Sequence, residues 1–358
     1  MGERYAVIDI GTVTARLAVS EVVDGRVHLV RKISTICNLG QGVDRTRMLD
    51  PEACDRVVAC VADYVAAARE LGATASVCTL TSAARDASNS DDLLTRLRAS
   101  SVEPQVIPGE IEGRLTFLGV AQDFPDKKIL VADNGGGSTE LACGRLVTAP
   151  APAAVAASAP ATATAPEPAA PAFANVPAPG LHMDLVVSTD VGCRRLTDRF
   201  LSKTDPPAAT DRADAHAFAA SLFGPVVARL HELGAAPEAL VVTGGTATTL
   251  VAIVKRLVPY DSARVHLAQI SRAQVAELEE RLGSLTVAER AEVPGIQAKR
   301  APVILAGNVA LGELMDQTGF DAMTVSESDL LVGMSLTLDA AVRGAASPVG
   351  WTPVFAKL

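Results

Sequence analysis

Two glycine turns, each set between apolar, strand-like runs, constrain the fold of this chain more than any other feature. The stretch ILVADNGGGSTELACG (129–144) runs from a hydrophobic strand into an aspartate, three glycines, two hydroxyl residues and a glutamate. The stretch YAVIDIGTVTARLAV (5–19) has the same order in a weaker form. Glycine lets backbone N–H groups turn toward an anion and lets that anion come close. The repeat therefore predicts two related halves with similar anion-binding turns.

A third loop, TGGTAT (243–248), also follows an apolar strand. A single glycine loop is as often a structural turn, but three loops of this kind predict a phosphate-binding site. Hydroxyl side chains add donors, and an acid at a strand end can hold Mg²⁺ beside the phosphate. The phosphate-binding residues that we predict in these loops are Asp9, Gly11, Thr12, Thr14, Gly135, Gly136, Gly137, Ser138, Thr139, Gly244, Gly245 and Thr246.

Strand-like and helical segments alternate along the rest of the chain, which predicts an α/β protein with two domains. We place the first domain at residues 1–125 and the second at 126–326. We expect a C-terminal helix and tail, residues 327–358, to pack back on the first domain. Residues 147–180 are rich in Ala and Pro and hold eight of the 21 prolines. We interpret that segment as a disordered insertion in a surface turn.

Composition excludes several classes of function. The net charge of −9 argues against a nucleic-acid partner or an anionic membrane surface, because either would need a basic face. The six cysteines are scattered and form no C-x-x-C pair, which favours a reduced compartment over a disulfide framework or zinc site. No signal-peptide pattern precedes the first strand. We therefore expect a cytoplasmic protein.

Further segments give the chain a resemblance to a known family. They are TSAARDASN (81–89), GEIEGRLTFLGV (109–120), VGCRRLTDRFL (191–201) and RAPVILAGNVALGELM (300–315). With the glycine loops, their order and spacing resemble the exopolyphosphatase/guanosine pentaphosphate phosphohydrolase (Ppx/GppA) family in its short, two-domain form. This family lies in the actin-like ATPase superfamily, so the resemblance implies two actin-like, ribonuclease H-like domains flanking a phosphate-binding cleft. The EGRLTFLGV segment separates the chain from the kinases of that superfamily.

The resemblance also implies roles for single residues. Glu112 matches the catalytic glutamate that positions or activates the attacking water. Asp133 and Glu140 match the acids that hold the metal, Mg²⁺ or Mn²⁺, and Arg85 matches an arginine that contacts phosphate. Arg195 corresponds to another family arginine. These residue types suit the chemistry, since hydrolysis of a phosphoanhydride needs charge neutralisation, an in-line water and a base.

We therefore expect an exopolyphosphatase that releases the terminal phosphate of inorganic polyphosphate. The alternatives are a hydrolase of the 5′-phosphate of guanosine pentaphosphate and a weakly catalytic sensor of polyphosphate or alarmone. Val13, Asn134 and Ile111 depart from the usual residues of the family motifs and motivate the sensor. A sugar- or acetate-type kinase is a weaker alternative. The resemblance is compatible with a homodimer, which nothing in the sequence itself establishes, and no nucleic-acid or membrane partner is expected.

Overall fold

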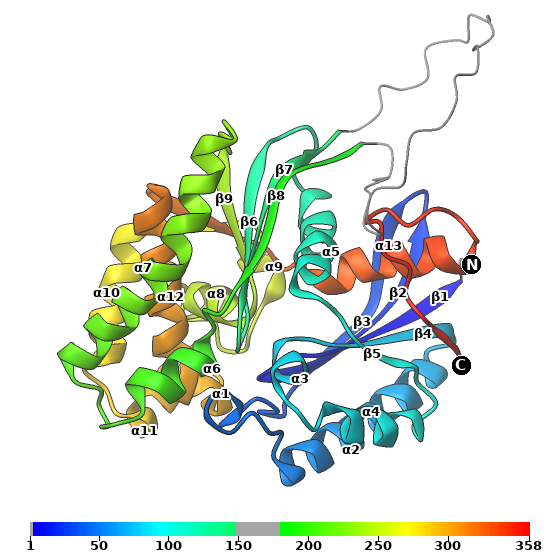
Figure 1. Ribbon diagram of the computed structural model, residues 1–358, viewed down its shortest axis with the longest axis horizontal. Coiled ribbons are helices and arrows are strands. Elements are labelled where there is room, and N and C mark those ends of the chain that lie inside the picture. The colour runs from blue at the N-terminus through cyan, green and yellow to red at the C-terminus, as the bar shows by residue number, and fades with distance from the viewer. Residues whose placement is uncertain (1–2, 148–179) are drawn as a thin grey trace, which may run out of the picture.

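Two six-stranded β-sheets stand side by side in the computed structural model, which describes residues 3–147 and 180–358 (Figure 1). The predicted disordered insertion therefore lies almost wholly outside the described residues. The first sheet contains β1 (Arg4–Ile10), β2 (Thr14–Val23), β3 (Arg26–Ile36), β4 (Ala73–Leu80), β5 (Pro104–Val106) and β12 (Ala356–Lys357). The second contains β6 (Ile129–Asn134), β7 (Thr139–Leu146), β8 (Leu181–Thr189), β9 (Ala239–Thr243), β10 (Ala268–Ser271) and β11 (Ala322–Val325).

The two sheets share one pattern of strand pairing. In the first, β1 pairs antiparallel with β2 and parallel with β4, and β3 follows β2 in antiparallel pairing. In the second, β6 pairs antiparallel with β7 and parallel with β9, and β8 follows β7 in antiparallel pairing. The two facing glycine turns join β1 to β2 and β6 to β7, whereas the third glycine loop joins β9 to a helix. The α/β class that we expected is confirmed.

The helices of the first half are short apart from α2, and those of the second half include three long ones. The first half contains α1 (Val43–Thr46), α2 (Pro51–Glu70), α3 (Ser82–Asp86) and α4 (Ser90–Arg98). The second contains α6 (Cys193–Leu196), a π-helical turn (Thr197–Leu201), α7 (Ala209–Glu232), α8 (Gly245–Val254), α9 (Ser262–Val265), α10 (Arg272–Gly283), α11 (Val287–Ala291), a 3₁₀ turn (Ala298–Arg300) and α12 (Ala301–Thr318).

Local sequence signals explain where several of these elements begin and end. Asp50 caps α2 by accepting a hydrogen bond from the backbone N–H of Ala53 at 2.9 Å, and Pro51 occupies the first helical position. Asp24 and Gly25 join β2 to β3 and both have positive φ, 51° and 74°. That conformation suits a two-residue hairpin turn, whose twist matches the strands that it joins.

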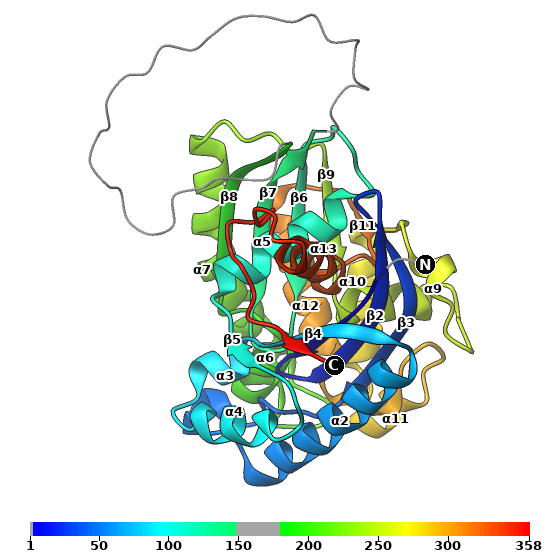
Figure 2. The same cartoon turned by 90° about the vertical axis from the view of Figure 1, so that its right-hand side faces the viewer.

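Helices α5 (Gly109–Ala121) and α13 (Leu330–Val342) lie between the two sheets (Figure 2). Helix α5 packs on β7 and β8 of the second sheet and against α13, and α13 packs on β1 and β2 of the first. Their apolar side chains form one buried cluster with residues of both sheets. This arrangement brings the start of α5, which carries Glu112, to the junction of the two halves.

The C-terminal residues return to the first sheet, where β12 pairs antiparallel with β4. Residues 4–106 and 356–357 supply the strands of the first sheet, and residues 129–325 supply those of the second. The domain boundaries at 125 and 326 remain predictions. Within the described ranges, we find no helix with the length and apolar character needed to span a bilayer.

Candidate active site

The two glycine turns have the same backbone geometry and face each other. The N–H of Gly11 donates to the carbonyl of Thr14, and the N–H of Gly135 donates to the carbonyl of Ser138, both at 3.0 Å. The turns are in close contact, because a Cβ added to Gly136 would lie within 2.8 Å of Thr12. Only glycine permits this approach. The structure thus brings the predicted phosphate loops of both halves together.

Glu112 and Arg85 form a partly buried ion pair close to Glu140, the residue that follows the second glycine loop. The Arg85 Nη1 lies 2.7 Å from Glu112 Oε2, and its Nη2 lies 3.8 Å from Glu140 Oε1. The same guanidinium donates to the carbonyl of Ile107 at 2.9 Å, which fixes its orientation. Ser188 donates to Glu140 Oε1 at 2.7 Å. One arginine therefore lies between the predicted catalytic acid and a predicted metal ligand.

The sequence around Glu112 contains two glycines that bring α5 close to β8. A Cβ on Gly109 would lie 2.4 Å from the Ser188 side chain, and a Cβ on Gly113 would lie 2.8 Å from that of Val186. The glycines of the GEIEGR segment thus allow the helix to pack tightly and place Glu112 beside Glu140. Ile111 is buried in the cluster between the sheets, which explains an apolar residue at this position.

The acids of the second half lie opposite each other. Asp133 and Glu140 are cross-strand partners in the β6–β7 hairpin, and both are buried. Burial raises the pKa of Asp133 to about 6, and burial together with the charge of Asp133 raises the pKa of Glu140 to about 7. Burial and the charge of Glu140 also raise the pKa of Glu112 well above its ordinary value, although Arg85 opposes this shift.

These acids fit a divalent metal ion. Within residues 3–147 and 180–358, no three His, Cys, Asp or Glu side chains are gathered as a complete metal site. Mg²⁺, however, is usually held by one or two carboxylates and completes its shell with waters and substrate phosphates. Asp133 and Glu140 supply hard oxygen donors whose buried charges oppose each other. Thr116 of α5 orients Asp133 by donating to its Oδ2 at 3.0 Å.

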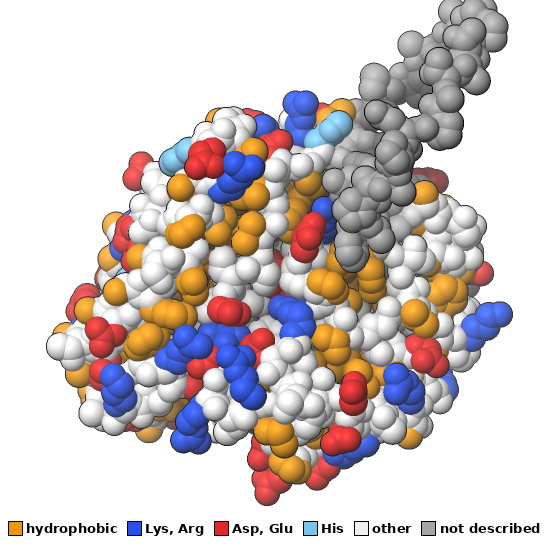
Figure 3. Space-filling model, viewed as in Figure 1, with side chains coloured by type: hydrophobic (Ala, Val, Ile, Leu, Met, Phe, Trp, Pro, Cys, Tyr) orange, Lys and Arg blue, Asp and Glu red, His pale blue; other side chains and the backbone are white. Residues whose placement is uncertain are grey.

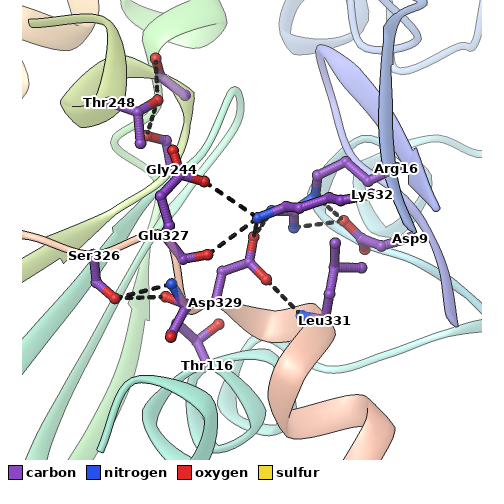
Figure 4. A network of polar contacts seen from close by, with 12 residues as sticks. Asp9, Arg16, Lys32, Thr116, Gly244, Thr248, Ser326, Glu327, Asp329 and Leu331 are labelled. Atoms are coloured by element: carbon purple, nitrogen blue, oxygen red, sulfur yellow. Dashed lines mark hydrogen bonds and ion pairs between the residues drawn. The ribbon is translucent and has the colours of Figure 1, made fainter. Parts of the chain in front are cut away.

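Asp9 of the first half lies in a network of charges at the junction (Figure 4). Arg16, its cross-strand partner, donates to Asp9 Oδ2 through Nη2 at 2.7 Å and contacts Asp329 at 2.9 Å. Lys32 of β3 also contacts Asp329, at 3.1 Å. Asp329 caps α13 by accepting from the N–H of Leu331. The Asp9 carboxylate therefore already has a cationic partner within the protein.

The third loop adjoins the second. Gly244 has a φ of 102° and precedes α8, and a Cβ added there would lie 2.7 Å from the carbonyl of Asn134. Gly245 lies beneath the guanidinium of Arg300, since an added Cβ would lie 2.2 Å from its Nη1. Burial and the charge of Arg16 lower the pKa of Arg300. Gly244 thus lies against the second glycine loop, and Gly245 lies against Arg300.

Two of the predicted hydroxyl donors, Thr139 and Thr246, make contacts inside the second half. Thr139 is fully buried and donates to the carbonyl of Val191, and Thr246 is buried against Gly307 of α12. Asn134 donates its side-chain amide to Thr139 at 2.9 Å. Val13 packs in the hydrophobic core of the second half. The unusual residues Val13 and Asn134 thus have structural contacts of their own.

From the sequence we predicted no role for Arg16, Lys32, Thr116, Ser188 or Asp329. Thr116 and Ser188 are neutral residues that acquire a role only where α5 meets the second sheet. Asp329 precedes a helix and could have been predicted as its N-cap. Its pairing with Arg16, however, joins residues that are 313 positions apart in the sequence. Such pairings are decided by the tertiary fold.

Known proteins share this sequence and architecture. Exopolyphosphatase 2 of Mycobacterium tuberculosis is 32% identical over 94% of this chain and 98% of its own length. A Ppx/GppA family member of Aquifex aeolicus is 25% identical, with a TM-score of 0.71 over 96% of this chain and 98% of that one. An exopolyphosphatase of Cytophaga hutchinsonii, 24% identical, has the same fold, with a TM-score of 0.76 over 96% and 99% of the two chains.

The sequence signature of the Ppx/GppA phosphatase family matches residues 18–157 and 178–338, which is most of the chain. The matched ranges include the second and third glycine loops, Arg85 and Glu112. The family resemblance and the actin-like fold expected from the sequence are both confirmed. The chain belongs to the Ppx/GppA phosphatase family.

Proposed function

We propose that this protein is an exopolyphosphatase that hydrolyses the terminal phosphoanhydride of inorganic polyphosphate. The observation that carries the proposal is the pairing of Glu112 with Arg85 beside Glu140, which directly follows the second glycine loop. The name of the Mycobacterium tuberculosis relative, which matches nearly end to end, supports the same substrate.

Glu112 is the proposed general base. Its raised pKa makes it a better proton acceptor than an exposed glutamate, and its Oε2 is held by Arg85 at a fixed position. Arg85 also places a positive charge where a phosphate oxygen would approach. The backbone N–H groups of the glycine turns supply further donors to phosphate oxygens without any side-chain rearrangement. These residues would position a water in line with the terminal phosphorus.

A divalent cation, Mg²⁺ or Mn²⁺, is the proposed cofactor, with Asp133 and Glu140 as its protein ligands. When bound, it would neutralise phosphate charge and lower the energy of the charge that develops during transfer. We also propose a cytoplasmic location, in keeping with six free, buried cysteines. The homodimer stays a prediction that light scattering would test.

The test is phosphate release from short-chain and long-chain polyphosphate, with Mg²⁺, by the wild type and by Glu112→Gln. Glu110→Gln is the matched control, because Glu110 is on the same helix, is largely exposed and pairs with Arg114. We expect the Glu112 variant to lose about 10²–10⁴-fold in kcat, whereas the control keeps its activity. Equal activity of Glu112→Gln and the wild type would refute the role of Glu112.

Guanosine pentaphosphate serves as the competing substrate in the same assay. A higher kcat/KM for it than for polyphosphate would replace our proposed substrate with the nucleotide. Tight polyphosphate binding without phosphate release from any substrate would identify the protein as a sensor.

A further inference from the structure

Arg195 is a buried arginine at the junction of the two halves, outside the group formed by Glu112, Arg85 and Glu140. It belongs to α6 of the second half and is only 4% exposed. Its Nε donates to the carbonyl of Gly137, in the second glycine turn, at 2.7 Å. Its two terminal nitrogens donate to Asp44 and Asp86 of the first half. One side chain therefore binds a phosphate loop and two acids of the opposite half.

The acids that Arg195 contacts lie on elements that carry other parts of the site. Asp86 ends α3 and follows Arg85, the partner of Glu112. Asp44 lies in α1, where it also accepts from Arg199. A contact between Arg195 and Asp86 thus links the second glycine turn to the segment that orients Arg85.

Further contacts surround this arginine. Asp198 accepts from the N–H of Gly42 at 3.0 Å, and Arg194 donates to Asn38 at 3.0 Å. Figure 1 shows α1, α3 and α6 meeting at one end of the junction. Figure 3 shows acidic and basic side chains gathered next to each other over the same part of that face. The two halves are therefore joined here by charged groups, whereas apolar packing joins them around α5 and α13.

The glycine turns touch each other beside these charged contacts. A Cβ on Gly137 would lie 2.3 Å from the Ser82 hydroxyl and 2.9 Å from that of Thr12. The cavity bounded by both turns and by Arg195 measures about 10 Å³, which is room for about one water molecule. A phosphate group is larger, so none fits between Thr12, Gly137 and Arg195 while the turns touch.

We infer that Arg195 is a positioning residue that latches the cleft closed. Its contacts with Asp44 and Asp86 must open for substrate to enter, and they re-form to set Arg85 and the Gly137 turn for reaction. The effect on catalysis rests on the proposed function, but closure itself does not.

The chemistry of arginine suits this role. Its planar guanidinium carries five donors in a fixed fork, so it can hold a carbonyl and two carboxylates at once. Burial disfavours its charge, but the hydrogen bond that it donates to Asp86 and the charges of the nearby acids keep its pKa above the ordinary value. Lysine would keep the charge without the fork, so Arg195→Lys separates geometry from charge.

The test compares the wild type with Arg195→Lys and Asp86→Asn, without substrate, by small-angle X-ray scattering and by hydrogen exchange. We expect both variants to scatter as a more open particle and to exchange the Gly42 amide faster, because the hydrogen bond that protects this amide, to Asp198, crosses the junction. Asp86 is partly exposed, so its variant keeps the test valid if the Arg195 variant folds poorly. Arg96→Gln is the control, since its ion pair with Asp55 lies within the first half.

Steady-state kinetics with polyphosphate then separates positioning from a general loss of structure. We expect kcat to fall about tenfold or more in Arg195→Lys, with a smaller change in KM, because a looser cleft misplaces Arg85 in the closed state. Arg199→Gln, which removes a second contact to Asp44 and a cation–π contact with Phe218 but leaves Asp86 bound to Arg195, should lose less.

Unchanged scattering and exchange in both Arg195→Lys and Asp86→Asn would overturn the latch. An open cleft with an unaltered kcat would overturn the positioning role. A wild type that releases no phosphate would refute the proposed function, while scattering and exchange would still decide whether Arg195 closes the cleft.

Discussion

The two glycine turns have the same hydrogen-bond pattern, but the aspartates at their strand ends have different cross-strand partners. Each turn closes with an N–H to carbonyl hydrogen bond of 3.0 Å, from Gly11 in the first half and from Gly135 in the second. The residue opposite Asp9 is Arg16, whereas the residue opposite Asp133 is Glu140. The first half thus neutralises its acid within the hairpin, and the second places an acid against an acid.

This difference shows how one supersecondary unit can serve two purposes. In the first hairpin the Asp9–Arg16 pair continues to Asp329 and joins the turn to α13. In the second, burial raises the pKa values of Asp133 and Glu140, and the charge of Asp133 raises that of Glu140 further, so their charged forms are unfavourable without a cation. The acid of the first turn is therefore neutralised by the protein itself, whereas the acids of the second turn are the ligands that we propose for a divalent cation.

Among the variants that test this difference, Glu140→Gln should have the largest effect on activity. We expect kcat for polyphosphate to fall about 100-fold or more, because a metal ligand is lost. In EDTA the variant should be at least as stable as the wild type, since it removes one of two opposed buried charges. Thermal unfolding with and without Mg²⁺ measures both effects.

Mg²⁺ should raise the melting temperature of the wild type and should raise that of Glu140→Gln much less. Glu110→Gln, an exposed neighbour of the site, serves as the control. An equal Mg²⁺ shift in Glu140→Gln and the wild type would remove Glu140 from the proposed ligands.

Removing the cation of the first hairpin should have the opposite effect on stability. We expect Arg16→Met to lose about 3–5 kcal/mol of unfolding free energy, because Asp9 is left buried without its partner. The double variant Asp9→Asn/Arg16→Met should recover part of this loss. Urea unfolding of the single and double variants gives the coupling energy. Additive single effects would mean that the two side chains do not act as a pair.

The two turns should also respond differently to a methyl group. A Cβ on Gly136 would lie 2.7 Å from the Val13 side chain across the junction, whereas a Cβ on Gly11 would meet only the Thr14 carbonyl of its own turn at 3.1 Å. We therefore expect Gly136→Ala to lower kcat about tenfold and Gly11→Ala to lower it less. Parallel assays of the two alanine variants decide the order, and a larger loss in Gly11→Ala would contradict the contact argument.

A pair of glutamates that lies away from both hairpins gives the smallest expected effect and serves as a reference for them. His216 of α7 lies 3.0 Å from both Glu279 of α10 and Glu313 of α12. The hydrogen bond to Glu279 raises the pKa of His216 in the folded state, although burial opposes it. Its stabilising contribution is therefore complete below pH ~6.5 and is lost as the pH rises through the raised pKa.

We expect His216→Gln to reduce the unfolding free energy by about 1 kcal/mol at pH 5.5 and by less at pH 9. Urea unfolding of the two proteins at both pH values measures the difference. A loss that is the same at both would show that His216 contributes by packing and not by its charge.

Local features of the fold could be predicted because neighbouring residues produce them. Asp50 and Pro51 start α2, and Asp24 and Gly25 form the β2–β3 turn, through backbone preferences that need no distant partner. The order of strands and glycine turns likewise indicated two related halves. The packing of α5 on β7 and β8 could not be predicted in this way, because its glycines become informative only beside Ser188 and Val186.

The amino-acid sequence by itself determined the two hairpins, their glycine turns and the presence of Glu112, Arg85, Asp133 and Glu140, since strand periodicity and turn chemistry act over a few residues. The tertiary structure alone decided which charges meet. Asp329 joins Arg16, and Arg195 joins Asp86, only after the halves pack. Burial then shifts the pKa values of the acids, because desolvation depends on everything that surrounds a group and not on its neighbours in the chain.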